Sequence, residues 1–418
     1  MAAAPVEREA GTVKVAALAA CWLGAAVLGT RLLLQVSRAA RQPSDGFAAY
    51  YTSARLLSQG ERADRFYEDS WFRSQTEHLA PGASDIYNVN PPTAAVLALP
   101  LIAFDHDMAR LVWTGLNLAL IAVSLTAVAW QLGLHGLRLP AFVCIATAFQ
   151  PLHANFQHGQ AYVLLLGLLL LVWIGIRQRR PAMLGVGLGL MLVLKTAAIP
   201  LWLLFLVRRQ WKALGWGLLT TVVVVMISLP RLGIEAWSTY VRLLPGLAAA
   251  PSLAVTAYQS QLGFFHHLLI FDPQWNPHPW LNVPWLGFWL PALAMLAMLI
   301  ASARAARRTD APDLVLALFV MASILLSPVA LDYHYVLALL PVAILLAHLP
   351  SWGSLDSLIA GLGWLTAVAA IGLNLPYQSA AIQGGAWALL AYPKLYGAIL
   401  LWILAMTGSS PGRIGDAR

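Results

Sequence analysis

The residues in this sequence that could do chemistry gather in a few polar stretches between long apolar runs. A carboxylate, Asp45, follows the first apolar run in RQPSDGFAAYYTSARLLSQG at 41–60, and Lys195 interrupts a later run. A carboxylate can accept a proton during a reaction, and a lysine, an imidazole or an amide can stabilise negative charge as it develops. Amide, hydroxyl and imidazole groups occur in NVNPP at 88–92, PLHANFQHGQ at 151–160, YQSQ at 258–261 and SPVALDYHY at 327–335.

Composition places these groups in a membrane protein. Of the 418 residues, 60% are hydrophobic and only 11% are charged, and the mean hydropathy is +0.70. Soluble domains carry about one quarter charged residues. The formal net charge of +8 comes from cations in short loops between the apolar runs, where they act as orientation signals. Nucleic acid is therefore not an expected partner.

The apolar runs predict an all-α polytopic membrane protein with about twelve transmembrane helices and a helical first outer loop. Polar segments at about 36–107 and 231–283 interrupt the runs, and residues 1–418 are expected to form one integral membrane domain. The run at 182–207 is too long for one upright span. We expect two short helices that meet at KTAAIP, because mid-bilayer Lys195 is costly unless it faces a polar cavity. The other predicted spans lie near 13–35, 108–131, 139–152, 160–176, 212–230, 284–303, 312–330, 333–349, 355–373 and 387–408.

Three basic clusters give the predicted orientation. They lie in short loops at 177–180, 208–212 and 304–308, and cytoplasmic loops carry an excess of lysine and arginine. If all three clusters are in the cytoplasm, both chain ends are cytoplasmic as well. The expected location is the inner (plasma) membrane of a bacterium. The two long polar segments and DYHY at 332–335 then lie on the outer face.

The polar stretches therefore concentrate at one face of the membrane. A transporter places such residues near the midplane, on discontinuous helices in two related halves. Only Lys195 and Thr196 suggest such a path here. The asymmetry favours an enzyme that acts at the outer surface on a membrane-anchored reactant. A lipid-linked sugar flippase or another transporter is the alternative, and a non-catalytic scaffold would not need these groups.

Several stretches occur together in an order that is typical of one family. They are DGFAAYYTSARLLSQG and YNVNPPTAAVLALPL in the first outer loop, HGQ before a helix, the lysine-centred break before RRQWKA, and SPVALDYHYVLALLP. With these motifs the chain resembles glycosyltransferase family 87, the polyprenyl-phosphate-mannose-dependent α-mannosyltransferases and related arabinofuranosyltransferases of the C-type membrane fold. It departs from the family pattern at LKT, where the family usually has lysine followed by proline.

The resemblance implies an inverting transfer of mannose, or of arabinofuranose, from a polyprenyl-phosphate donor to a glycolipid or glycan acceptor on the outer face. It implies that the outer-loop aspartate, Asp45, deprotonates the acceptor hydroxyl. His334 and Lys195 are expected at the donor phosphate, with membrane lipid around the protein. Since the leaving group is a lipid phosphate, no nucleotide motif, cofactor or metal is needed. The further candidates for substrate binding are Asp332, Gln259, Asn90 and Gln160.

Simpler roles stay open for several of these residues. Asp45 could cap the helix predicted at 46–58, and Lys195 could extend its ammonium group to the membrane interface. His334 could be an ordinary interface histidine and Asp332 a helix cap. His153 and His158 are five residues apart, a poor spacing for two metal ligands on one helix face. Three other loop acids, Asp64, Asp69 and Asp85, are expected to be solvated, and an aromatic belt is expected of Tyr50, Tyr51 and Tyr87.

Overall fold

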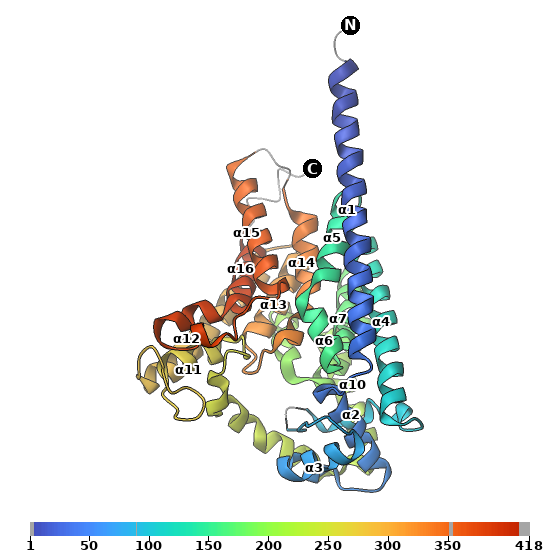
Figure 1. Cartoon of the computed structure of the whole chain (residues 1–418), viewed down its shortest axis with the longest axis vertical. Helices are drawn as coiled ribbons and strands as arrows, with labels where there is room; N and C mark the ends of the chain where they lie inside the picture. Colours follow the sequence, from blue (N-terminus) through green and yellow to red (C-terminus); the bar gives the residue numbers. More distant parts are fainter. Residues whose placement is uncertain (1–3, 89, 351–353, 409–418) are drawn as a thin grey trace.

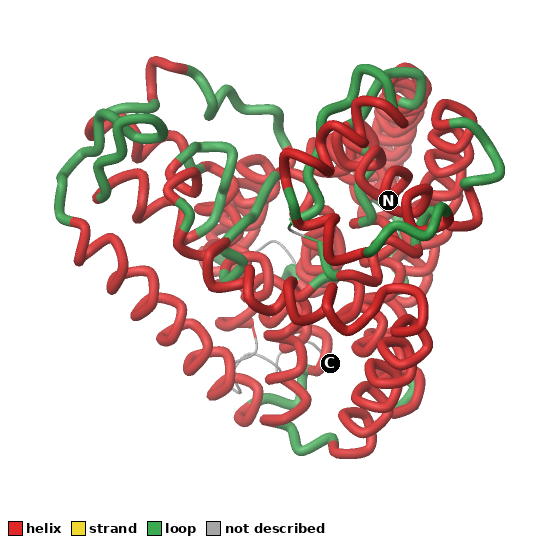
Figure 2. The backbone as a smooth tube through the Cα atoms, turned by 90° about the horizontal axis from the view of Figure 1, so that it is seen from below, coloured by secondary structure: helices red, strands yellow, loops and turns green. Residues whose placement is uncertain are grey.

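The computed structural model describes residues 4–88, 90–350 and 354–408. Within these ranges the chain is all helical, as predicted. Figure 2 shows helices joined by loops without a strand, and an isolated β-bridge joins Asp272 and Asn276. In Figure 1, α2 and α3 lie at the end of the molecule opposite to the beginning of α1.

Sixteen α-helices follow one another in the described ranges. They are α1 (Ala4–Ala39), α2 (Asp45–Ser58), α3 (Asp69–Leu79), α4 (His106–Gln131), α5 (Arg138–Ala148), α6 (Gln150–His158), α7 (Tyr162–Arg177), α8 (Pro181–Leu194), α9 (Ile199–Val207), α10 (Trp211–Ala249), α11 (Gln261–Leu269), α12 (Pro284–Arg308), α13 (Pro312–Leu325), α14 (Leu339–His348), α15 (Leu355–Gly372) and α16 (Pro393–Gly408). Short 3-10 helices join them: η1 (Ala63–Tyr67), η2 (Pro92–Val96), η3 (Leu99–Leu101), η4 (Thr196–Ala198), η5 (Pro251–Ala254), η6 (Asp332–Ala338), η7 (Ala380–Ile382) and η8 (Gly385–Ala391).

The number of uninterrupted membrane-spanning helices is smaller than the sequence suggested. Among the described residues, five helices are long and apolar enough to cross a membrane: Lys14–Ala39, His106–Gln131, Trp211–Ala249, Pro284–Arg308 and Leu355–Gly372. The pair η8 and α16, bent by 55°, would make a sixth. Six further apolar helices have only 10–17 residues, and a helix of 16 residues spans about 24 Å of a hydrocarbon layer of about 30 Å. The predicted count of about twelve spans is not confirmed.

The predicted helix break at Lys195 is confirmed. α8 ends at Leu194, Lys195 is extended with φ −155° and ψ 128°, and η4 leads into α9. Pro200 is the second residue of α9, a position where its missing N–H costs nothing because the first turn has no intrahelical partner for it. The predicted helix at 46–58 is also present as α2.

One helix extends further than predicted. The second polar segment was expected to begin at 231, but α10 continues to Ala249. A bend at Gly233, with φ 74° and ψ 156°, divides it. That backbone conformation is essentially restricted to glycine. Around and beyond the bend, Leu232, Ala236 and Tyr240 pack against the segment 45–104.

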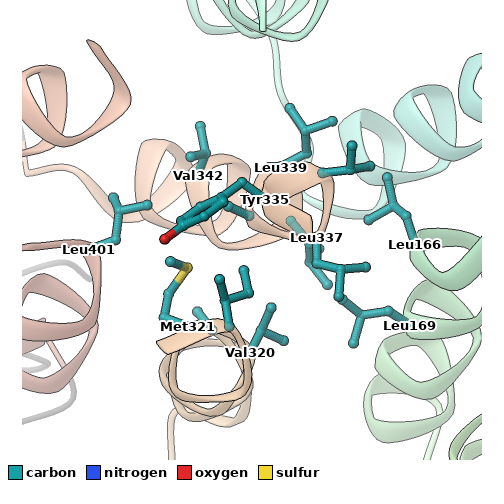
Figure 3. Packing of buried hydrophobic residues seen from close by; sticks show 14 of the residues in the cluster. Leu166, Leu169, Val320, Met321, Tyr335, Leu337, Leu339, Val342 and Leu401 are labelled. Carbon is teal, nitrogen blue, oxygen red and sulfur yellow. The ribbon is translucent and has the colours of Figure 1, made fainter. Parts of the chain in front are cut away.

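Most of the apolar core lies in the helix bundle, around α13. Every residue of this helix from Leu314 to Leu325 is buried. Figure 3 shows Val320 and Met321 of α13 facing Tyr335, Leu337 and residues of α7, α14 and α16. This bundle core consists mainly of aliphatic side chains.

A second core lies within the segment 45–104, which we call the cap. Its large side chains are mainly aromatic, and they pack against α4 and the far half of α10. The prediction that three tyrosines form an aromatic belt is wrong, because they are 1%, 2% and 0% exposed and lie inside this cap core: Tyr50, Tyr51 and Tyr87.

Candidate active site

The turn His158–Gln160 between α6 and α7 is the point where the cap meets the bundle. Gly159 is left-handed with φ 64°, and a side chain there would collide with the guanidinium of Arg110. That guanidinium donates to the carbonyl oxygen of Phe156 at 2.6 Å, and the Trp113 indole N–H donates to the carbonyl of Gly159 at 2.9 Å. Two α4 side chains therefore fix the main chain of this turn.

Helix α2 lies directly on the same turn. Gly46 leaves no space for a side chain, because a Cβ atom would run into the His158 carbonyl and the Gln160 amide. The Tyr50 hydroxyl donates to Oε1 of Gln160 at 2.9 Å. These contacts hold the first turn of α2, and thereby Asp45, at the start of α7.

Asp45 is exposed at the first position of α2 and is not its N-cap. The N-cap residue is Ser44, whose side chain makes no capping hydrogen bond. Among the described residues, the Asp45 carboxylate accepts one long hydrogen bond, 3.5 Å, from the Ser84 N–H. Burial lowers the pKa of His158, and the charges of Asp45 and Asp332 oppose this effect. Both carboxylates are therefore close enough to act on the same imidazole.

A second carboxylate, Asp85, accompanies Asp45. The prediction that Asp85 is solvated is wrong, since the side chain is half-buried. Burial, together with the negative charge of Asp45, raises the pKa of Asp85 to about 7, although the Ile86 N–H and the charge of Lys195 act in the opposite direction. Sequence analysis expected a solvated side chain because the burial of Asp85 depends on the packing of α2 and the bundle, which no local pattern shows.

Lys195 points to the cap rather than toward open solvent. Its ammonium group donates to Oδ1 of Asn90 at 2.6 Å, and the nitrogen lies 6.0 Å from the ring centre of Tyr162. Asn90 is only 4% exposed, and its carbonyl accepts from the Tyr67 hydroxyl. The hydrogen bond between Lys195 and Asn90 thus connects the helix break to the predicted NVNPP turn.

His334 packs against two tyrosine rings that also contact each other. The ring centres of Tyr162 and Tyr333 are 4.4 Å and 4.9 Å from that of the imidazole. Nδ1 of His334 accepts from the Leu331 N–H at 3.1 Å, so the proton of the neutral imidazole is on Nε2. His334 therefore presents an N–H donor on the side away from its own helix turn.

Asp332 and Gln259 are bound to protein groups. The Tyr377 hydroxyl donates to Asp332, and Nζ of Lys394 lies 3.7 Å from the same carboxylate. Gln259 is 0% exposed. Its Nε2 donates to the carbonyls of Thr256 and Ala391 at 2.7 Å and 2.8 Å, and its Oε1 accepts from a main-chain N–H. The predicted substrate contact of Gln259 stays a prediction, and such a contact would have to replace one of these bonds.

A cavity of 490 Å³ lies beside this region. Its walls come from the chain around 254–257, 275–278 and 378–384, and the last segment directly follows Tyr377. The cavity contains an exposed indole together with imidazole and amide groups, which are Trp275, His278, Gln378 and Gln383.

The structure thus brings most of the predicted residues to one end of the bundle. Asp45, Gln160, Lys195 and Asn90 meet around the first turn of α7, with His334 and, through His158, Asp332 nearby. Sequence analysis missed Lys394, the second residue of α16, whose only signal was a lysine inside the predicted span 387–408. Among the described residues no three histidine, cysteine, aspartate or glutamate side chains are grouped as a metal site.

Comparisons with known proteins place this arrangement in a family. The model of glycosyltransferase family 87 matches residues 88–328. This range contains Asn90, Gln160, Lys195 and Gln259, whereas Asp45, Asp332 and His334 lie outside it. No solved structure matches the chain.

Curated relatives come from mycobacteria. A polyprenol-phosphate-mannose-dependent α-(1-2)-phosphatidylinositol mannoside mannosyltransferase of Mycobacterium tuberculosis is 27% identical over 63% of this chain and 62% of its own length. The protein of the same name from Mycolicibacterium smegmatis is 26% identical over 70% and 68%. An α-(1→3)-arabinofuranosyltransferase of M. tuberculosis is 30% identical over 38% of each chain. The chain thus spans less than two thirds of the length of the first and third of these relatives.

The family model matches more than half of the residues of this chain. The chain therefore belongs to glycosyltransferase family 87.

Proposed function

We propose that this chain is an inverting glycosyltransferase that moves mannose, or arabinofuranose, from a polyprenyl-phosphate donor to a lipid- or glycan-linked acceptor. The observation that carries the proposal is the exposed Asp45 carboxylate held at the same end of the bundle as Lys195 and His334. Family membership and the printed names of the mycobacterial relatives support the donor class.

Asp45 is proposed as the general base. In an inverting transfer the acceptor oxygen attacks the anomeric carbon while the bond from that carbon to the phosphate oxygen breaks. The acceptor proton passes to a carboxylate on the acceptor side. Asp45 suits this role because it is exposed and forms only one long hydrogen bond within the described structure. Asp85, with its pKa of about 7, is the second candidate.

The departing phosphate is proposed to lie between Lys195 and His334. A lipid phosphate gains negative charge as the sugar leaves, and preorganised donors stabilise that charge. The ammonium group of Lys195 and the Nε2–H of His334 are such donors. Asn90 positions the ammonium group through its 2.6 Å hydrogen bond, and Gln160 and Asp332 are proposed to contact the sugar.

The acceptor glycan is proposed to extend into the 490 Å³ cavity. An exposed tryptophan with imidazole and amide groups offers a stacking surface and hydrogen bonds for a sugar. Trp275 is 43% exposed there. The cavity adjoins Gln378, next to the tyrosine that bonds Asp332.

The membrane arrangement is part of the same proposal. We place the chain in a bacterial plasma membrane as a single domain of the C-type glycosyltransferase fold with about twelve spans, counting short and bent helices. Both termini are cytoplasmic and the site is on the outer face, as the basic clusters favour. A lipid-linked sugar flippase is disfavoured, because the polar groups gather at one end instead of following a path through the bilayer.

The test is transfer by purified Asp45→Asn protein, supplied with labelled polyprenyl-phosphate mannose and arabinofuranose in separate reactions. Asparagine keeps the size of the side chain and removes its basicity. We expect a loss of roughly a hundredfold or more, with donor binding retained. Asp64→Asn is the control, since Asp64 pairs with Arg62 at 2.7 Å at the surface of the same loop. If Asp45→Asn transfers at the parental rate while Asp85→Asn does not, the base is Asp85.

A further inference from the structure

A second cavity, of 530 Å³, lies at the opposite end of the helices that carry the site. α7 begins beside the site and ends at Arg177, and α8 begins at Pro181 and ends before Lys195. The cavity is lined by the turn between these helices and by the turn between α9 and α10. At 1.5 Å per residue, about 24 Å of helix separates it from the site, so it is not part of the proposed transfer machinery.

Four cations surround this cavity: Arg179, Arg180, Arg209 and Lys212. All four are exposed, and within the described structure their side chains make no ion pair or hydrogen bond. Their sequence neighbours differ. Arg177 pairs with Asp313 at 2.9 Å, and Arg208 donates to the Thr309 carbonyl at 2.6 Å. Four unpaired positive charges around one cavity favour an anionic ligand.

The two turns carry arginine in an unfavourable backbone conformation. Arg179 has φ 54° and Arg209 has φ 53°, and among the described residues these are the two non-glycine positions with positive φ. The left-handed region is disfavoured for residues with a Cβ atom, and glycine is the usual residue there. Glycine would adopt this backbone conformation with less strain. Each turn nevertheless has an arginine at this position, and its guanidinium lies at the cavity.

The walls of the cavity are apolar. Ile176, Leu184 and Ala213 line it, and the exposed Trp211 indole stands at its edge. Close packing of α8 on α10 keeps the two turns side by side, since a Cβ atom on Gly185 would collide with the main chain of α10. Cations at the rim and hydrocarbon inside fit an amphiphile better than a soluble anion.

We propose that this cavity binds an anionic phospholipid from the leaflet that surrounds this end of the bundle. The headgroup phosphate lies among Arg179, Arg180, Arg209 and Lys212, and an acyl chain follows the apolar wall between α8 and α10. Basic pockets between helices at the cytoplasmic side of membrane proteins bind phospholipid headgroups in this way. The proposal does not depend on the transferase activity.

The experiment measures lipid retained by the purified full-length protein in detergent, by native mass spectrometry. Cardiolipin and phosphatidylglycerol are compared with zwitterionic phosphatidylethanolamine and with soluble glycerol phosphate. We expect at least tenfold tighter binding of the anionic lipids than of phosphatidylethanolamine. The double variant Arg179→Gly, Arg209→Gly should lose that preference and melt no earlier than the parent, because glycine suits both turns.

The matched control is Arg307→Gln, Arg308→Gln, which removes two exposed cations at the end of α12 that do not line this cavity. Lipid binding should persist in the control. Equal loss in both double variants would mean non-specific charge attraction and overturn the proposal. Binding of glycerol phosphate as tight as that of the lipids would also overturn it, in favour of a soluble ligand. Absence of any preference among the lipids would do the same.

Discussion

The bundle core and the cap core differ in their side chains and in how their main-chain carbonyl groups find hydrogen-bond partners. Around α13 the backbone is satisfied inside each helix, so aliphatic side chains such as Leu318 need only fill space. The cap is built of short helices and turns whose carbonyl groups lack such partners. Tyrosine hydroxyls supply them: Tyr51 donates to the Phe104 carbonyl at 2.9 Å, and Tyr87 donates to the carbonyl of Pro91 at 3.0 Å.

This difference explains why aromatic residues concentrate in the cap. A tyrosine buries a large apolar ring and still brings a donor to a main-chain acceptor, and a buried carbonyl without a partner is costly. The cap core also gains from the hydrophobic effect, whereas helices in lipid exchange one apolar contact for another. The two cores should therefore respond differently to the loss of a large side chain.

The largest expected effect is in the cap. Phe66 is 0% exposed, and its ring centre lies 5.9 Å from that of Phe72 and 5.6 Å from that of Tyr87. Phe66→Ala should destabilise the cap by about 3–5 kcal/mol. The corresponding change in the bundle, Leu318→Ala, should lower the free energy of unfolding by less. When helices of the bundle separate, their apolar side chains contact lipid instead of water. Hydrogen exchange measures this, at residues 45–104 in Phe66→Ala and at α13 in Leu318→Ala, each compared with the parent. An equal loss of protection at the two places would refute the comparison.

A smaller effect is expected at the junction of the two regions. His334→Ala removes the Nε2–H donor proposed for the donor phosphate and should lower donor turnover by at least tenfold, or about 1.4 kcal/mol. His348→Ala is the control, since His348 ends α14 and its side chain bonds the Ile344 carbonyl of the same helix. Steady-state rates with labelled donor decide the matter. Parental turnover in His334→Ala would move the phosphate site elsewhere.

The smallest effect concerns pH. The pKa of Asp85 is raised by burial to about 7, above about 4 in an unfolded chain. The folded state therefore binds more protons between pH 4 and pH 7, and cap stability falls as pH rises through this window. We expect a loss on the order of 1 kcal/mol, since water screens a half-buried carboxyl. Asp85→Asn should flatten the profile in thermal melts at pH 5 and pH 8. An unchanged slope would mean that Asp85 ionises freely.

The sequence predicted what depends on local signals. A lysine and a proline inside one apolar run mark a break in any bilayer-embedded helix, so Lys195 was placed correctly. Asp85 carries no such mark, because its surroundings come from α2 and from Lys195, more than a hundred residues away along the chain. The predicted count of about twelve spans is not confirmed for a related reason. Hydropathy detects apolar runs but not the bend at Phe149 that divides the predicted span 139–152 between α5 and α6.

The bend at Gly233 has a consequence for how the cap is placed on the bundle. α10 packs against α8 in the bundle before the bend and against the cap beyond it, so one helix connects the two cores at a fixed angle. The backbone conformation at the bend, φ 74° and ψ 156°, is essentially restricted to glycine. A residue with a Cβ atom at 233 would be strained there, and we expect the strain to reach Tyr240 and the aromatic core that it contacts. Gly233 thus contributes to the placement of the cap, together with the contacts of α2, Lys195 and the turn before α7.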